Sequence, residues 1–64
     1  MHYLFIANIG DYVTYKTEGN GNLDGYVKLI NMRGINVSTD YGDRFVKWKN
    51  IITLDKNKKA VWVK

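Results

Sequence analysis

Apolar and polar residues alternate with a period of two along most of the chain. The alternation is clear in residues 12–16, 26–29, 35–38, 44–49 and 61–64. A period of two places every second side chain on one face of a strand, whereas a helix requires a period near 3.6. Each stretch also has the length of an ordinary strand. The pattern therefore predicts a series of short β-strands.

The segments between these stretches have the composition of turns. Residues 18–22, 31–34, 40–43 and 55–59 are rich in glycine, asparagine, aspartate and lysine. Such residues favour tight connections between antiparallel strands, and Gly42 can adopt the positive φ that a tight turn requires. The chain contains no proline, so every predicted strand is able to pair on both sides.

The alternating strands share one apolar face. The inward set is expected to comprise Val13, Tyr15, Val27, Leu29, Ile35, Val37, Val46, Trp48, Ile51, Leu54, Val61 and Val63. A sheet of this size covers such a face only by curling on itself, which also reduces its exposed edges. We therefore expect an all-β single domain over residues 1–64, a small, strongly bent antiparallel barrel of five to six short strands.

Residues 2–6 form a further apolar segment, with apolar side chains at both odd and even positions, and so on both faces of a strand. This pattern suits either a strand buried on both sides or a strand lying against another chain. With 64 residues, the protein buries only a modest core, and association with a second copy is one way to increase the buried area. A homodimer is accordingly one of the predicted states.

Composition removes several classes of function. The chain has no cysteine and a single histidine, His2, so we expect no disulfide, no metal site and no cofactor. It also lacks a Ser/His/Asp arrangement and a phosphate-binding loop, and the Asp40 and Asp43 pair is typical of a turn. We therefore predict a binding protein that is not an enzyme and has no small-molecule substrate.

Charge and hydropathy point to the environment and the partner. No apolar run is long enough to cross a membrane and residues 1–10 lack the features of a secretory signal, so we expect a cytoplasmic protein without membrane contact. The net charge of +4 and the pI near 9.5 favour an acidic partner over a basic one.

Two stretches resemble the SH3-like barrel group that includes KOW and Tudor domains. Residues 9–13 (IGDYV) and 25–30 (GYVKLI) are similar to the two glycine-led strands of many such barrels, and residues 37–46 (VSTDYGDRFV) resemble the Tudor strand, D-Y-G turn and returning strand. The resemblance covers residues 9–54. It implies a binding module. Tudor-like domains often bind methylated Lys or Arg in an aromatic cage, and in this sequence only Tyr41 stands at a position that matches the motif. The positive charge agrees better with the nucleic-acid or transcription-machinery partners of KOW-like barrels.

The leading hypothesis is a nucleic-acid-binding module, for DNA or RNA, associated with transcription or translation. By alternation, Phe45, Lys47 and Lys49 share the outer face of one strand while Val46 and Trp48 point inward. Lysines bind phosphates and an exposed ring stacks on a base. Phosphate contacts are assigned to Lys28, Arg44, Lys47 and Lys49, and stacking to Tyr26, Tyr41 and Phe45. An ordinary solvated strand face is the competing interpretation of the same residues.

The alternative hypothesis is a protein-interaction or self-associating adaptor module, of phage or mobile-element origin, that docks on a host protein. Aromatic residues are numerous at the positions predicted to face outward, and exposed apolar patches usually mark an interface. Binding would then rest on Tyr3, Phe5 and Trp62. A structural subunit of a larger assembly is the third interpretation of this surface.

Overall fold

The computed structural model describes residues 7–63, which form an all-β fold of five antiparallel strands. The strands are β1 (Tyr12–Lys16), β2 (Asn22–Ile30), β3 (Gly34–Thr39), β4 (Gly42–Lys47) and β5 (Ile51–Asp55). A short 3-10 helix, η1 (Trp48–Asn50), joins β4 to β5. The strand order is β4-β3-β2-β1-β5, so β4 and β5 are the edges of one sheet. The predicted antiparallel all-β class is confirmed, and the segment 2–6 lies outside the described residues.

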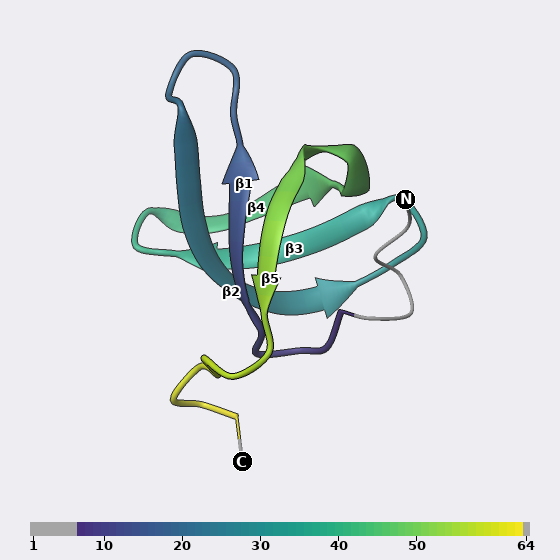
Figure 1. Ribbon diagram of the computed structural model, residues 1–64, viewed down its shortest axis with the longest axis vertical. Helices are drawn as coiled ribbons and strands as arrows, with labels where there is room; N and C mark the ends of the chain where they lie inside the picture. Colours follow the sequence, from purple (N-terminus) through teal and green to yellow (C-terminus); the bar gives the residue numbers. More distant parts are fainter. Residues whose placement is uncertain (1–6, 64) are drawn as a thin grey trace.

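The sheet bends strongly because two of its strands are irregular. The register of β2 with β3 shifts between Val27 and Leu29, and that of β1 with β5 shifts between Thr14 and Tyr15. Such irregularities bend a strand and increase its local twist. Figure 1 shows the result: β1 and β5 run across β3 and β4 at a steep angle, and the long β2 curves from one direction into the other.

The concave side of the bent sheet holds the core. Val13 and Tyr15 of β1 and Ile35 and Val37 of β3 are buried, as the alternation predicts. The buried apolar side chains are those of Ala7, Val13, Tyr15, Val27, Ile35, Val37, Val46, Trp48, Ile51 and Ala60. Leu23, Ile30 and Leu54 pack against this cluster and remain partly exposed.

The prediction that Leu29 points inward is wrong. Its side chain is 55% exposed, whereas Val27 is fully buried. The irregularity in β2 lies between these two residues and inserts Lys28 out of register, so Val27 faces Val37 whereas Leu29 faces Asn36. One extra residue exchanges the two faces of a strand. Ile30, instead of Leu29, packs against the core.

The strand predicted over residues 61–64 is also wrong for its described part, residues 61–63, which form a turn. Val61 is fully exposed, contrary to its predicted inward position. Val63 is half-buried and packs so closely on Gly10 that a Cβ at position 10 would clash with the Cγ2 atom of Val63. Ala60 donates a backbone hydrogen bond to the Gly10 carbonyl at 2.9 Å. The segment 60–63 thus packs against Gly10 through Ala60 and Val63 without joining the sheet.

Trp48 is buried as predicted but begins η1 instead of continuing a strand. Its indole Nε1–H donates to the carbonyl oxygens of Asn31 (3.2 Å) and Met32 (2.9 Å). These acceptors belong to the turn between β2 and β3, in which the Asn31 side chain also accepts from the Arg33 and Gly34 amides. Trp48 therefore joins the core to that turn and satisfies two of its carbonyls.

A buried carboxylate fixes the start of β1 to the segment after β5. Asp11 is 0% exposed and is the one fully buried acidic residue of the described chain. Its oxygens accept from the Lys56 ammonium at 2.7 Å, the Asn8 amide at 2.8 Å and the Lys59 ammonium. Burial alone would raise the pKa of Asp11, but the hydrogen bonds from Lys56, Lys59 and Asn8 outweigh it and lower that pKa below 3.8.

We predict that Asp11→Asn lowers the free energy of unfolding at pH 7 by roughly 1.5–3 kcal/mol, the range for hydrogen bonds to a charged group. Because the folded-state pKa is depressed, the stabilisation by Asp11 is complete well above pH 3.8 and is lost as the pH falls through the folded pKa. Urea denaturation of the parent protein and of Asp11→Asn, from pH 7 to below pH 3.8, measures the difference in the free energy of unfolding.

Asp43→Asn is the matched control for Asp11→Asn, because Asp43 and its partner Lys28 are both 52% exposed. Exposed ion pairs contribute about 0–1 kcal/mol. Equal destabilisation by the two substitutions would contradict the structural role assigned to Asp11.

Candidate functional site

A groove of about 440 Å³ lies where the curl of the sheet brings β4 close to the end of β1. It is lined by Lys16, Thr17, Glu18, Phe45, Lys47, Lys49 and Asn50, and we name it the basic groove. Although two strands separate β1 from β4 in the sheet, residues of both line the same hollow. Three of the predicted site residues, Phe45, Lys47 and Lys49, therefore share one surface.

The basic groove combines free positive charge with an exposed ring. Phe45 is 48% exposed and stands among three lysines and one glutamate. Among residues 7–63, no carboxylate lies within 4.0 Å of Lys16, Lys47 or Lys49. These ammonium groups are thus available to an external anion.

Four other lysines bind groups of the protein itself. Lys56 and Lys59 bind Asp11, and Lys28 binds Asp43 at 3.0 Å. The Lys58 ammonium lies 4.3 Å from the centroid of the Tyr12 ring, which is a cation–π distance. The lysine-rich segment 55–59 is therefore largely engaged in structure, and the free positive charge of the described chain is concentrated elsewhere.

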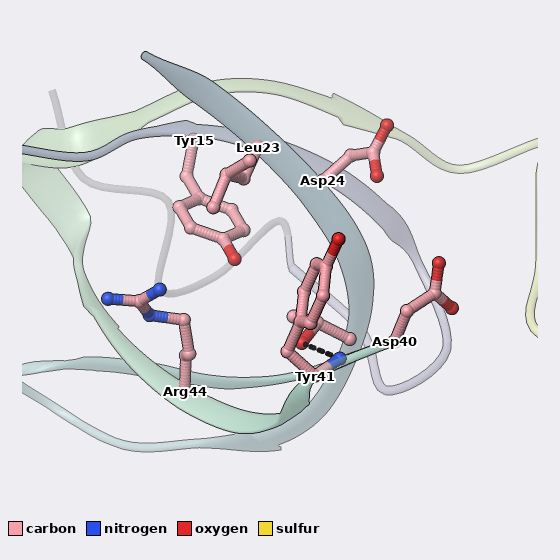
Figure 2. A pocket seen from close by; sticks show the side chains of 7 residues that line it. Tyr15, Leu23, Asp24, Asp40, Tyr41 and Arg44 are labelled. Atoms are coloured by element: carbon pink, nitrogen blue, oxygen red, sulfur yellow. Dashed lines mark hydrogen bonds between the residues drawn. The ribbon is translucent and has the colours of Figure 1, made fainter. Parts of the chain in front are cut away.

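Arg44 and Tyr41 lie apart from the basic groove, in a second and smaller hollow of about 60 Å³. We name it the tyrosine pocket; it is lined by Tyr15, Leu23, Asp24, Thr39, Asp40, Tyr41 and Arg44. Figure 2 shows the Arg44 guanidinium and the Tyr15 hydroxyl on one side of the Tyr41 ring, and the two aspartates on the other. The structure thus separates these two predicted site residues from Lys47 and Lys49.

Tyr26 packs against Tyr12 instead of standing free. The two rings are 5.4 Å apart in a T-shaped arrangement. The Tyr12 hydroxyl donates to the Asp24 carboxylate, and this hydrogen bond is the largest cause of the raised pKa of Tyr12. Tyr26 is therefore held in an aromatic pair at the centre of the sheet and borders Asp24 and Asp40.

The remaining predicted site residues lie in other places. Trp62, 45% exposed, lines a concavity of about 310 Å³ together with Lys28 and Ser38. Lys28 is thus placed beside Trp62 and paired with Asp43, away from the basic groove. Tyr3 and Phe5 lie outside the described residues.

Sequence reasoning missed Lys16 and Asn50 of the basic groove. Lys16 follows buried Tyr15 in β1, so its outward direction was visible in the alternation. That Lys16 lines the same groove as Phe45 was not visible, because this depends on the curl of the whole sheet. The pairing of Asp11 with Lys56 and Lys59 was also hidden, because these lysines lie 45 and 48 residues from Asp11 in the sequence.

No protein-family model, curated protein or solved structure matches the chain. Within residues 7–63 there is no helix long and apolar enough to cross a membrane. The same residues contain no group of three or more His, Cys, Asp or Glu side chains placed to hold a metal ion.

Proposed function

We propose that this protein binds nucleic acid through the basic groove. The observation that carries the proposal is the gathering of Lys16, Lys47 and Lys49 around the half-exposed Phe45, with none of the three ammonium groups bound to a carboxylate of residues 7–63. The groove presents both parts of a nucleic-acid contact. The lysines neutralise phosphates and the ring offers a face for a base.

The chemistry of the groove favours contacts with the nucleic-acid backbone over recognition of particular bases. Lysine ammonium groups bind phosphates without distinguishing bases, and a stacked base contributes about 1–3 kcal/mol whatever its identity. Asn50 and Thr17 are the neutral polar side chains of the groove that can form hydrogen bonds with a base edge or a sugar. We therefore expect binding with modest sequence preference.

The fold proposed for this module is the SH3-like barrel. Three features support it: the strand order β4-β3-β2-β1-β5, the 3-10 turn between β4 and β5, and the extra residues in β2 and β5 that accompany the crossing of one part of the sheet over the other. The basic groove would then lie at the seam of the barrel, between the end of β1 and the edge strand β4.

We predict that Lys47→Glu weakens binding to fluorescently labelled single-stranded DNA and RNA and lowers the slope of log affinity against log salt by about one unit. Fluorescence anisotropy at several salt concentrations measures both quantities. Lys58→Glu is the matched control, since it makes the same change of charge at a lysine that lies on the Tyr12 ring. Salt-independent binding, or equal loss in the two variants, would refute the proposed groove.

A second candidate function, self-association as an adaptor module, is favoured by the C-terminal segment. Val61 is fully exposed and Trp62 is 45% exposed beside the concavity it forms with Lys28 and Ser38. Tryptophan is one of the residues enriched among those that contribute most to the binding energy of an interface.

For this second function, we predict that light scattering detects a dimer at high protein concentration whose affinity changes little with salt, because apolar burial drives it. Trp62→Ser should weaken the dimer by about thirtyfold or more, the effect of removing a central interface residue. Phe45→Leu, at an exposed aromatic residue of the basic groove, should leave the dimer unchanged. A wild-type chain that stays monomeric would exclude this function.

A further inference from the structure

The tyrosine pocket contains a buried polar group that no part of the described chain satisfies. Tyr15 is 1% exposed, and its hydroxyl is the one buried side-chain polar atom of residues 7–63 without a hydrogen-bond partner. In Figure 2 this hydroxyl points into the pocket, toward the space between Arg44 and Tyr41. A buried hydroxyl without a partner is costly, so a ligand that accepts from it gains a hydrogen bond that the described chain does not supply.

The Tyr15 hydroxyl and the Arg44 guanidinium belong to the same face of the sheet. Tyr15 lies opposite Leu23 across β1 and β2, and Arg44 lies opposite the fully buried Val37 across β3 and β4. Directly opposite residues of antiparallel strands project to the same side, so all four side chains lie on the concave side of the sheet. Burial is the largest cause of the raised pKa of the Tyr15 phenol, and the positive charge of Arg44 is close enough to oppose this rise.

Both groups can donate hydrogen bonds to one anion. Because its pKa is raised, the Tyr15 phenol carries a proton to donate at neutral pH. Arg44 is exposed, and no carboxylate of residues 7–63 lies within 4.0 Å of its guanidinium, so its side chain can turn and admit a ligand oxygen to the hydroxyl. A guanidinium binds a planar carboxylate through two parallel hydrogen bonds. The concave side of the pocket thus supplies the donors that a carboxylate requires.

The two aspartates that line the tyrosine pocket lie on a different side from these donors. Asp24 follows Leu23 in β2 and therefore points to the opposite face, where its carboxylate accepts from the Tyr12 hydroxyl. Figure 2 shows the Tyr41 ring between both aspartates and Arg44. Their repulsion acts on any anion beside Arg44 in proportion to its charge, so the site favours a single negative charge over two.

We propose that the tyrosine pocket binds a carboxylate monoanion, whose oxygens accept from the Tyr15 hydroxyl and the Arg44 guanidinium. The free volume of about 60 Å³ has room for roughly four to six water-sized groups, enough for a carboxylate and a short carbon stem. Leu23 and the Tyr41 ring are the apolar walls for that stem, and the Tyr41 amide is held by the Thr39 hydroxyl. Two sources present this group: a free small carboxylic acid and the C-terminus of a peptide.

This site is distinct from the basic groove although both use β4. Side chains alternate along the strand, so Arg44 lies on the same face as buried Val46, and Phe45 on the opposite face with Lys47. A carboxylate in the tyrosine pocket and a nucleic acid in the basic groove therefore contact different faces of β4, and the two proposals can fail separately.

The test is an NMR titration of the full chain at pH 7 and constant ionic strength. Propionate and N-acetyl-L-alanine are the carboxylate probes, and propionamide and N-acetyl-L-alanine amide are their uncharged counterparts. Methyl phosphate, which is mainly a dianion at this pH, tests the preference for a single charge. We expect saturable shifts in the backbone amides of residues 39–44 with the carboxylates, binding at least about tenfold weaker with the amides, and weaker binding of methyl phosphate than of the acids.

The carboxylate that binds more tightly identifies the source: propionate indicates a free small acid, and N-acetyl-L-alanine indicates the end of a peptide chain. Three results would overturn the proposal. These are no saturable shift with either acid, equal binding of the amides, and binding of methyl phosphate as tight as that of the acids.

Tyr15→Phe and Arg44→Gln should each weaken the binding of the carboxylate probes by about tenfold, the effect of losing one hydrogen bond to a charged group. Tyr15→Phe removes a hydroxyl without a partner in residues 7–63, so the variant should keep its fold, and unchanged amide spectra outside the pocket verify this. Arg33→Gln is the matched control, because it makes the same change of charge in the turn at the other end of β3, and it should bind the probes as the parent protein does. Unweakened binding by Tyr15→Phe or Arg44→Gln, or an equal loss in Arg33→Gln, would contradict the assigned contacts.

Discussion

The carboxylate of Asp11 is the point at which the two ends of the described chain are joined. It has no exposure to water, and it receives the ammonium groups of Lys56 and Lys59 together with the Asn8 amide. A buried charge persists only where such partners replace its hydration. The path of the chain before β1 and after β5 follows from this requirement, and with it the position of the C-terminal turn against Gly10.

The same constraint separates structural lysines from available ones. Lys56 and Lys59 are committed to Asp11 and Lys58 to the Tyr12 ring, so the segment richest in lysine presents little free charge. The curl of the sheet then gathers Lys16, Lys47 and Lys49 from strands that are not neighbours. Within residues 7–63, three of the lysines that form no ion pair thus lie in one groove, while Asp24 and Asp40 lie together in another part of the surface.

Strand alternation was sufficient to predict the class of the fold and most of its core, because Val13, Val27, Val37 and Val46 obey a period of two. It failed at Leu29, where an irregular residue in β2 exchanges the faces of the strand, and at residues 61–63, where a strand-like pattern forms a turn. Local pattern also identified Phe45, Lys47 and Lys49 as one surface. It had no means of revealing the tyrosine pocket, which is assembled from four strands and a turn.

The pairing of β1 with β5 has a consequence for the newly made chain. These two strands are among the most distant in sequence, yet Val13 lies opposite Leu54 in the sheet, and Tyr15 opposite Ile51. While the chain leaves the ribosome, β2 is the first of the two described neighbours of β1 to emerge, and the other edge of β1 lacks its native partner until β5 emerges. An open strand edge is a site for pairing with other chains. The last strand of the sheet therefore acts as the closing element that protects the first from aggregation.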